Sequence, residues 1–333
     1  MRCTSKRTFC LVLAFALLLL TGCKGAGYSA KYSMDESASD KKDDLFYPTF
    51  ASDLCVADED KKPEDSDLEI YEKASAGLFD LTRKETIYSK NINLRVMPAS
   101  LTKVMTAYVA LKYGSLDQVL TAKSDVYVNE SGAQKVNLKE GDKMTLDQAL
   151  HLLLIYSAND VANLIASNIT GPQGEDFITL MNEEAVNIGA TNSHFENPHG
   201  LTSDEHYVTA YDMYLMFSAA MQYDTFSEII NMTEYSTTYQ DAKGGTVEIS
   251  KTNTNGFLSG AKSAPPGVTV IGGKTGTTNA AGHCLILLAR DTNGDPYIAV
   301  IMRDEDAGVL YTDMSRLLEE IVGLGCLLTG NNL

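Results

Sequence analysis

Strand-forming sequence stands at both ends of the globular part of this chain, and helix-forming sequence fills the middle. Two early strands flank a polar turn at residues 82–84, and an amphipathic helix is predicted at 311–324. The predicted strands are SAGLFDL (75–81), ETIYSKN (85–91), TVEIS (246–250), VTVIGGKTG (268–276), GHCLILLAR (282–290) and PYIAVIMR (296–303). This order predicts an α/β (α+β) fold, in which an antiparallel sheet is flanked by helices and carries an inserted all-helical subdomain over about residues 101–221.

The first 22 residues have the layout of a secretory signal peptide, because basic residues precede an apolar run too short to span a bilayer. The run ends in LTGC (20–23), which resembles the lipobox of bacterial lipoproteins. In a lipobox the leader is cut before the cysteine, whose sulfur then carries a diacylglyceryl group. We therefore expect a signal peptide over 1–22, lipidation at Cys23 and attachment to the outer face of the cytoplasmic membrane. A plain leader with an incidental cysteine is the alternative.

The segment after Cys23 is rich in Ser, Asp, Lys and Glu and has too few apolar residues to offset the entropy of ordering. It predicts a flexible acidic tether over 23–67, from which pieces such as LFYPTFASDLCV (45–56) can pack onto the domain. One large domain is expected over 68–328, followed by a tail at 329–333.

Charge and cysteine content exclude some functions. The chain has 27 basic and 44 acidic residues, and removal of the leader brings its net charge to about −20, which disfavours nucleic-acid binding. Three cysteines remain beyond the leader and the lipobox: Cys55, Cys284 and Cys326. Their spacing fits no metal site, so no metal is expected. One disulfide can form among them, with the pair left open, and Cys284 reads as a core residue.

The stretch MPASLTKVMTAYVAL (97–111) places a serine and a lysine one helical turn apart, at the edge of an apolar stripe. Residues at i and i+3 share a face of a helix, so the Lys103 amine can reach the Ser100 hydroxyl. A serine hydroxyl needs a base to become a nucleophile, and a lysine with a lowered pKa can be that base. Ser-x-x-Lys alone also occurs by chance, with a solvated lysine.

A second polar pair lies in YSANDVANLIA (156–166). The stretch TLDQ (145–148) predicts a capping box that opens a helix through Tyr156, and a second helix begins near Asp160. Ser157 and Asn159 therefore lie on a tight connection, where a hydroxyl and an amide can relay a proton and hold a substrate amide. The alternative is a simple helix cap.

The third stretch, IGGKTGTTNAAGHCLILLAR (271–290), carries glycines on both sides of a Lys-Thr pair inside a strand. Glycine weakens a strand unless a ligand or another backbone must approach closely. Lys274 and Thr275 therefore suit a substrate carboxylate laid along the strand edge. A Gly-rich hairpin with a solvated lysine is the alternative.

Ser-x-x-Lys, Ser-x-Asn and Lys-Thr-Gly in this order are the signature of the serine acyltransferases that react with penicillin. The chain resembles the low-molecular-mass penicillin-binding proteins, specifically the serine-type D-alanyl-D-alanine carboxypeptidases. The likeness covers about residues 74–325 and includes MNEEAVNIGATNSHFENPHGLTSDEHYVTAYDM (181–213). Many members carry a further C-terminal β-domain and an amphipathic membrane anchor. We expect neither here, with a lipid on Cys23 in place of the anchor.

The resemblance implies a function and a role for each motif residue. It implies removal of the terminal D-alanine from peptidoglycan stem pentapeptides through an acyl-enzyme on Ser100, without a cofactor, and acylation by β-lactams. Lys103 would take the Ser100 proton, and Ser157, oriented by Asn159, would pass it to the leaving amine. Four residues would bind the substrate: Lys274, Thr275, Gly276 and Thr277. The Ser100 and Thr277 N–H groups would form the oxyanion hole.

Other functions stay open at this point. A β-lactamase shares the three motifs, but the Glu-x-x-Leu-Asn of the class A enzymes is missing between Asn159 and Lys274. D,D-endopeptidase or transpeptidase activity would use the same residues, and a non-enzymatic wall-binding lipoprotein is the remaining alternative. His194, His199 and His206 lack zinc-site spacing, and His199 is expected to fix a turn. Arg303 either adds charge near the carboxylate site or lies on the surface.

Overall fold

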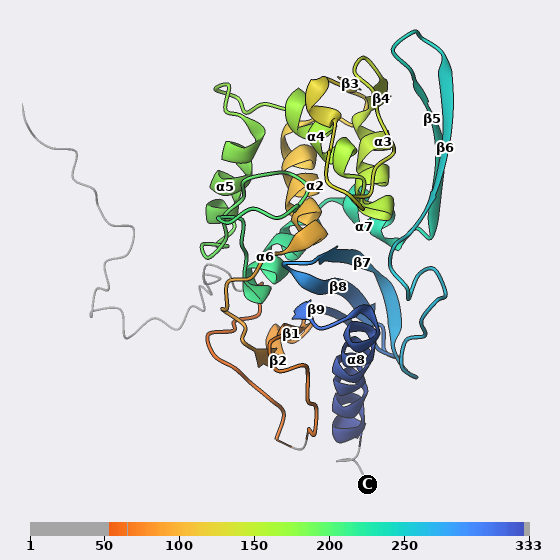
Figure 1. Cartoon of the computed structure of the whole chain (residues 1–333). Helices are drawn as coiled ribbons and strands as arrows, with labels where there is room; N and C mark the ends of the chain where they lie inside the picture. The colour runs from red at the N-terminus through yellow and green to blue at the C-terminus, as the bar shows by residue number, and fades with distance from the viewer. Residues whose placement is uncertain (1–52, 65, 330–333) are drawn as a thin grey trace, which may run out of the picture. The chain divides into compact units, whose positions relative to one another are not determined.

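The computed structural model describes residues 53–64 and 66–329 (Figure 1). Its centre is a five-stranded antiparallel sheet in the order β2-β1-β9-β8-β7, built from both ends of the chain. The strands are β1 (Ser75–Asp80), β2 (Glu85–Lys90), β7 (Thr269–Thr278), β8 (Gly282–Arg290) and β9 (Pro296–Asp304). The predicted antiparallel sheet with flanking helices is confirmed, and β7 forms one edge of it.

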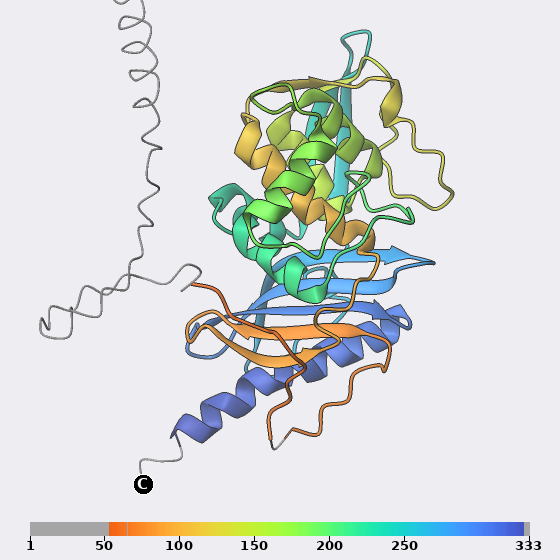
Figure 2. The same ribbon diagram turned by 90° about the vertical axis from the view of Figure 1, so that its left-hand side faces the viewer.

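Both faces of the sheet are buried. Alternate residues of β8 point to opposite faces, as the two-residue period of a strand requires. Leu285 and Leu287 pack in a core with α8 (Ala307–Thr329), whereas Ile286 packs in the larger core on the other face. Figure 2 shows the sheet between α8 on one side and the remaining helices on the other. Two-sided burial explains why these strands read as nearly continuous apolar runs.

The helices expected over about residues 101–221 run from Thr102 to Asn231 in the structure. They are α2 (Thr102–Tyr113), α3 (Leu146–His151), α4 (Asn159–Asn168), α5 (Phe177–Asn187), α6 (Ala210–Ala220) and α7 (Asp224–Asn231), with the short helices η1 (Ala99–Leu101), η2 (Ser124–Val126) and η3 (Leu152–Tyr156). α6 contacts β1 and β9, and α7 contacts β7. α2 is the centre of this layer, since every residue from Thr102 to Ala110 is buried.

The structure has a second, smaller sheet, of which the sequence analysis predicted only the last strand. It has the order β3-β4-β5-β6, with β3 (Val119–Thr121), β4 (Lys143–Thr145), β5 (Glu234–Gln240) and β6 (Thr246–Thr252). β3 and β4 are three residues long, too short to show a period. β5 and β6 form the long hairpin seen beside α3 and α4 in Figure 1.

The segment before β1 is packed against the domain where the structure describes it. Cys55 is fully buried, its N–H donates to the Tyr214 hydroxyl at 2.8 Å, and Lys61 pairs with Ser89 in an isolated bridge. The prediction of a free tether as far as residue 67 is therefore wrong for residues 53–64, whose backbone and Cys55 find partners on the folded domain. The earlier expectation that pieces up to Val56 can pack there agrees with this contact.

Several predictions fall on residues outside the described ones: the signal peptide, Cys23 and the side chain of Cys326. Cys55 and Cys284 are buried free thiols. In the described ranges, no helix combines the length and the apolar composition needed to cross a bilayer.

Candidate active site

The first motif folds so that its serine and lysine meet. Ser100 lies in the short helix η1, just before α2, and Lys103 Nζ donates to Ser100 Oγ at 2.9 Å. Ala99, immediately before Ser100, has φ 47°, which is a strained conformation for a residue with a Cβ. A hydrogen-bond chain supports this turn, because Thr102 Oγ1 donates to Ala99 O at 2.9 Å and itself lies 2.9 Å from His206 Nε2.

Lys103 is fully buried and has three acceptors. Besides Ser100 Oγ, its Nζ donates to Asn159 Oδ1 and to the His199 carbonyl, each at 2.7 Å. Burial, and next the positive charge of Lys274, lower the pKa of Lys103 well below its usual range, against an opposing effect of Asp160. The lowered pKa favours the neutral form of the amine that lies beside Ser100 Oγ.

The second motif follows a change of helix type. α3 opens with the predicted capping box of Thr145 and Gln148, and the chain then continues as the π-helical turn η3 up to Tyr156. Ser157, which ends this turn, takes the left-handed conformation with φ 68°. Such π turns are frequent at functional sites because they re-aim the residue that follows. Here the turn directs the Ser157 hydroxyl to Lys274, whose Nζ donates to Ser157 Oγ at 2.9 Å.

Asn159 is the first residue of α4 rather than part of the connection, and it is buried. Its Oδ1 accepts from Lys103, which leaves Nδ2 as the end of the amide that can donate to a ligand. Its backbone N–H donates to Gln134 O at 2.8 Å. Asp160 accepts from the N–H groups of Val136 and Leu138, so the loop before β4 is fixed beside Asn159.

The third motif lies on β7, at the edge of the sheet that faces η1. Lys274 is 1% exposed, its pKa is lowered to about 7 by burial, and its Nζ donates to Ser157 Oγ and to Thr275 O. A Cβ on Gly276 would lie 2.9 Å from Ser100 N, closer than real Cβ contacts allow. Glycine at 276 therefore lets β7 approach the turn that carries the serine.

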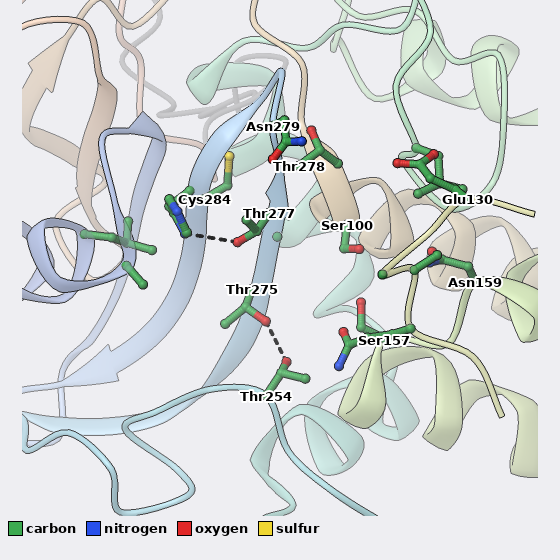
Figure 3. Close-up of a pocket in the computed structure, with 18 of the residues that line it drawn as sticks. Ser100, Glu130, Ser157, Asn159, Thr254, Thr275, Thr277, Thr278, Asn279 and Cys284 are labelled. Atoms are coloured by element: carbon green, nitrogen blue, oxygen red, sulfur yellow. Dashed lines mark hydrogen bonds between the residues drawn. The ribbon is translucent and has the colours of Figure 1, made fainter.

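An open cleft of about 530 Å³ joins the three motifs (Figure 3). In Figure 3, Thr275 and Thr277 on β7 face Ser100, Ser157 and Asn159 from the helical side. Two hydroxyl pairs line the strand side: Thr254 Oγ1 is 2.6 Å from Thr275 Oγ1, and His283 Nδ1 is 3.2 Å from Thr277 Oγ1. The lining residues are Ser100, Glu130–Gln134, Ser157, Asn159, Leu201, Thr254, Thr275–Asn279, His283, Cys284, Ala307, Leu310 and Tyr311.

Comparison with known proteins identifies the family. The sequence model of the D-alanyl-D-alanine carboxypeptidases matches residues 62–306. The chain belongs to this family. It is 32% identical over 228 residues to the D-alanyl-D-alanine carboxypeptidase DacF of Bacillus subtilis, and the match covers 67% of this chain and 55% of that protein. It is 31% identical over 251 residues to DacC of Escherichia coli, covering 72% of this chain and 59% of that protein.

A Streptomyces relative is matched over more of its length. The D-alanyl-D-alanine carboxypeptidase of Streptomyces sp. is 30% identical over 245 residues, which are 70% of this chain and 81% of that protein. Among solved structures, the DD-transpeptidase of the same Streptomyces strain aligns with a TM-score of 0.70 and 26% identity, covering 78% of this chain and 100% of that one. A putative penicillin-binding protein homologue of Mycobacterium tuberculosis aligns with a TM-score of 0.67 and 27% identity, covering 79% and 97%.

The remaining sequence candidates have structural roles or lie elsewhere in this member of the family. His199 does fix a turn, since its Nδ1 accepts from the Leu201 N–H at 3.1 Å, and its carbonyl holds Lys103. Arg303 is exposed and does not line the cleft. His194 Nδ1 is 2.6 Å from Glu205 O. In the described part of the chain, no three His, Cys, Asp or Glu residues lie together in a way that could hold a metal ion.

Sequence reasoning missed Thr254, His283 and the Glu130–Gln134 loop. His283 has a readable signal, because a hairpin that turns after Thr278 places residue 283 opposite Thr277 in register. Thr254 has none, since it follows β6 and is brought to Thr275 only by the tertiary fold, through its N–H to Ile155 O.

Proposed function

We propose that this protein is a serine D-alanyl-D-alanine carboxypeptidase that cuts the terminal D-alanine from peptidoglycan stem pentapeptides. The observation that carries the proposal is the 2.9 Å hydrogen bond from Lys103 Nζ to Ser100 Oγ. Burial and the charge of Lys274 lower the pKa of Lys103, which favours the neutral amine, the form that can accept the Ser100 proton as a general base. Membership of the carboxypeptidase family supports the choice of substrate.

In the proposed acylation step, Ser100 Oγ attacks the carbonyl carbon between the two D-alanines, and Lys103 takes the hydroxyl proton. The peptide C–N bond breaks, and Ser157 passes a proton to the departing amine of D-alanine. Lys103 returns the proton taken from Ser100 to Ser157 Oγ, which Lys274 Nζ holds in place by its hydrogen bond, so both lysines end the step as they began it. The acyl group stays on Ser100 as an ester.

The substrate is proposed to lie along the outer edge of β7, where an extended peptide can add as a strand. Asn159 Nδ2 would donate to a carbonyl of the substrate, and Thr275 and Thr277 would bind its C-terminal end beside Gly276. The N–H groups of Ser100 and Thr277 would hold the developing oxyanion, with each donor contributing about 3 kcal/mol. Water then hydrolyses the ester. A β-lactam enters by the same attack and remains on Ser100.

The experiment uses the domain from residue 53 onward and a pentapeptide ending in D-Ala-D-Ala. Release of free D-alanine by the wild type and not by Ser100→Ala supports the proposal. A wild-type protein that binds the pentapeptide without releasing D-alanine would favour the non-enzymatic wall-binding alternative.

Transfer to an amine in place of water is the second candidate. The Streptomyces relative is named a carboxypeptidase in one comparison and a DD-transpeptidase in the other, so one scaffold carries both names. Adding glycine to the assay distinguishes the two reactions, because a transpeptidase forms a new peptide ending in glycine. An internal D,D cross-link as substrate tests endopeptidase activity, and turnover of nitrocefin tests β-lactamase activity.

We also propose that a lipid on Cys23 anchors the protein at the outer face of the cytoplasmic membrane. The support is the LTGC stretch after an apolar leader. Metabolic labelling with a radioactive fatty acid should mark the wild type, and Cys23→Ala should lose both the label and the membrane association. A Cys23→Ala protein that stays in the membrane fraction would overturn the anchor.

A further inference from the structure

A carboxylate at the end of the substrate needs a positive charge in a site that is otherwise acidic. The formal net charge of the whole chain is −17. Among the described residues, no arginine or lysine side chain lines the cleft, and Glu130 is the carboxylate at its rim. Lys274 Nζ is buried, has its pKa lowered to about 7 and donates to Ser157 Oγ and Thr275 O. Its charge is therefore shared with the acylation machinery.

His283 is the one ionisable nitrogen group that does line the cleft, within the described residues. It is half-buried at the start of β8 and pairs in register with Thr277. Thr275 and Thr277 are two residues apart on β7, so their side chains share a sheet face with His283. The dashed line at Thr277 in Figure 3 marks the 3.2 Å contact between His283 Nδ1 and Thr277 Oγ1.

An imidazolium at this position has the donors that a carboxylate requires. It carries N–H groups on both nitrogens. With Nδ1 donating to Thr277 Oγ1, the Nε2–H remains as a donor to a ligand. The Thr277 hydroxyl, accepting from His283, is then able to turn its own hydrogen toward the same ligand. Thr275, fixed by Thr254 at 2.6 Å, adds a third contact on this face, the second from a hydroxyl.

Because carboxyl groups surround His283, a positive charge on its ring is needed for a substrate carboxylate to bind there. Asp304 is its register partner on β9, is 2% exposed, and has an Oδ2 without a hydrogen-bond partner in the described residues. Burial raises the pKa of Asp304 to about 6, which still leaves it largely ionised at neutral pH. Asp306, at the start of α8, interacts electrostatically with His283. Without a cation between them and the cleft, these groups repel a substrate carboxylate.

We propose that His283 is the specificity residue for a free C-terminal carboxylate, binding it as an imidazolium together with Thr275 and Thr277. This inference rests on the proposed carboxypeptidase function and gives that function its preference for chain ends. A substrate whose last residue is amidated gains nothing from the charge.

The test compares two substrates that differ only in this group. Wild type, His283→Asn and His283→Arg are assayed on a D-Ala-D-Ala peptide and on its C-terminal amide. A charge-assisted hydrogen bond contributes about 1.5–3 kcal/mol, so His283→Asn should lose at least about tenfold in kcat/KM on the acid. The amide should change less than about twofold, because no charge is matched there. His283→Arg should recover most of the loss on the acid, and His194→Asn is the matched histidine control outside the cleft.

A second readout is independent of peptide turnover. Acylation of Ser100 by benzylpenicillin, which carries a carboxylate, should slow in His283→Asn, whereas acylation by its methyl ester should not. Equal losses on acid and amide, or no loss on either, overturn the role of His283 while the wild-type activity stands. A wild type that neither releases D-alanine nor takes penicillin removes the proposed function and this inference together. If His283→Asn is poorly folded, His283→Gln takes its place.

Discussion

Lys274 Nζ donates a hydrogen bond to Ser157 Oγ at 2.9 Å, although the two residues are 117 positions apart in the sequence. Lys103 forms the equivalent contact with Ser100 Oγ at the same distance. The site thus holds two lysine–serine pairs, and in the proposed mechanism one serves the nucleophile and the other the leaving group. Because the positive charge of Lys274 also lowers the pKa of Lys103, the two pairs are electrostatically linked.

Removing the charge at 274 should change the pH dependence of acylation. With Lys274→Gln, the pKa of Lys103 rises, because one of the two causes of its lowering is gone. The base is then protonated up to a higher pH, so the acid limb of the penicillin acylation rate shifts upward and the rate at neutral pH falls. Stopped-flow acylation between about pH 5 and about pH 10 measures the shift.

Lys262→Gln is the matched control, since this lysine lies outside the cleft. An acid limb that stays in place in Lys274→Gln, or that moves to lower pH, would show that Lys274 does not act on Lys103 through its charge.

The close approach of β7 to η1 predicts that Gly276→Ala strongly slows acylation without unfolding the protein. The added Cβ would lie 2.9 Å from Ser100 N and 3.1 Å from Leu101 N, so the serine must move. A displacement of about 1 Å costs on the order of 100-fold in rate. The penicillin acylation rate and the melting temperature are measured together, with the exposed Thr269→Ala on the same strand as control. Acylation at the wild-type rate would contradict the contact.

The sequence predicted the motifs and the large sheet for clear physical reasons. Ser100 and Lys103 are one helical turn apart, so their contact is local. The β8 strand is buried on both faces, so its run of apolar residues was visible. What joins Lys103 to Asn159, and Lys274 to Ser157, is tertiary packing, and the family resemblance supplied that convergence where spacing alone did not.

Other parts of the site leave no mark in the sequence. The π turn before Ser157 looks like ordinary helix, because Leu152–Tyr156 is apolar throughout. Glycine is the usual sequence signal of a positive φ, and because residue 99 is an alanine its positive φ could not be predicted. The cleft loop at Glu130–Gln134 has no period; the Asn159 N–H donates to Gln134 O, and Asp160 holds the residues that follow the loop.

The hydrogen bonds that link His206 to Thr102 and Thr102 to Ala99 predict that the free energy of unfolding depends on pH. Burial lowers the pKa of His206 from 6.5 to about 4, so the unfolded chain takes up a proton before the folded one does. The contribution of neutral His206 to the free energy of unfolding is complete above about pH 6.5 and is lost as pH falls toward about 4. Between about pH 7 and about pH 5 this group alone should cost about 2 kcal/mol of unfolding free energy.

Urea unfolding at the two pH values gives the measurement. His206→Gln should be less stable at neutral pH and should lose about 2 kcal/mol less on acidification. His194→Gln serves as the matched control and should keep the wild-type difference. If His206→Gln keeps it as well, another group causes the acid sensitivity.

The Thr254–Thr275 contact predicts an effect on substrate binding more than on chemistry. Thr254→Val removes the hydroxyl that lies 2.6 Å from Thr275 Oγ1, so the Thr275 hydroxyl loses its fixed orientation. We expect the KM for a D-Ala-D-Ala peptide to rise about fivefold, as for a lost hydrogen bond of about 1 kcal/mol, with kcat nearly unchanged. Thr254→Ser should behave as the wild type. A fall in kcat at constant KM would instead make Thr254 part of the proton path.

Acylation of one serine by penicillin tests the convergence of the three motifs most directly. The protein is incubated with benzylpenicillin and its intact mass and digested peptides are measured. The wild type should gain one penicilloyl group, on the peptide that contains Ser100, whereas Ser100→Ala and Lys103→Met should gain none. An adduct on another residue, or an undiminished adduct in Lys103→Met, would show that the serine and lysine held 2.9 Å apart are not the reacting pair.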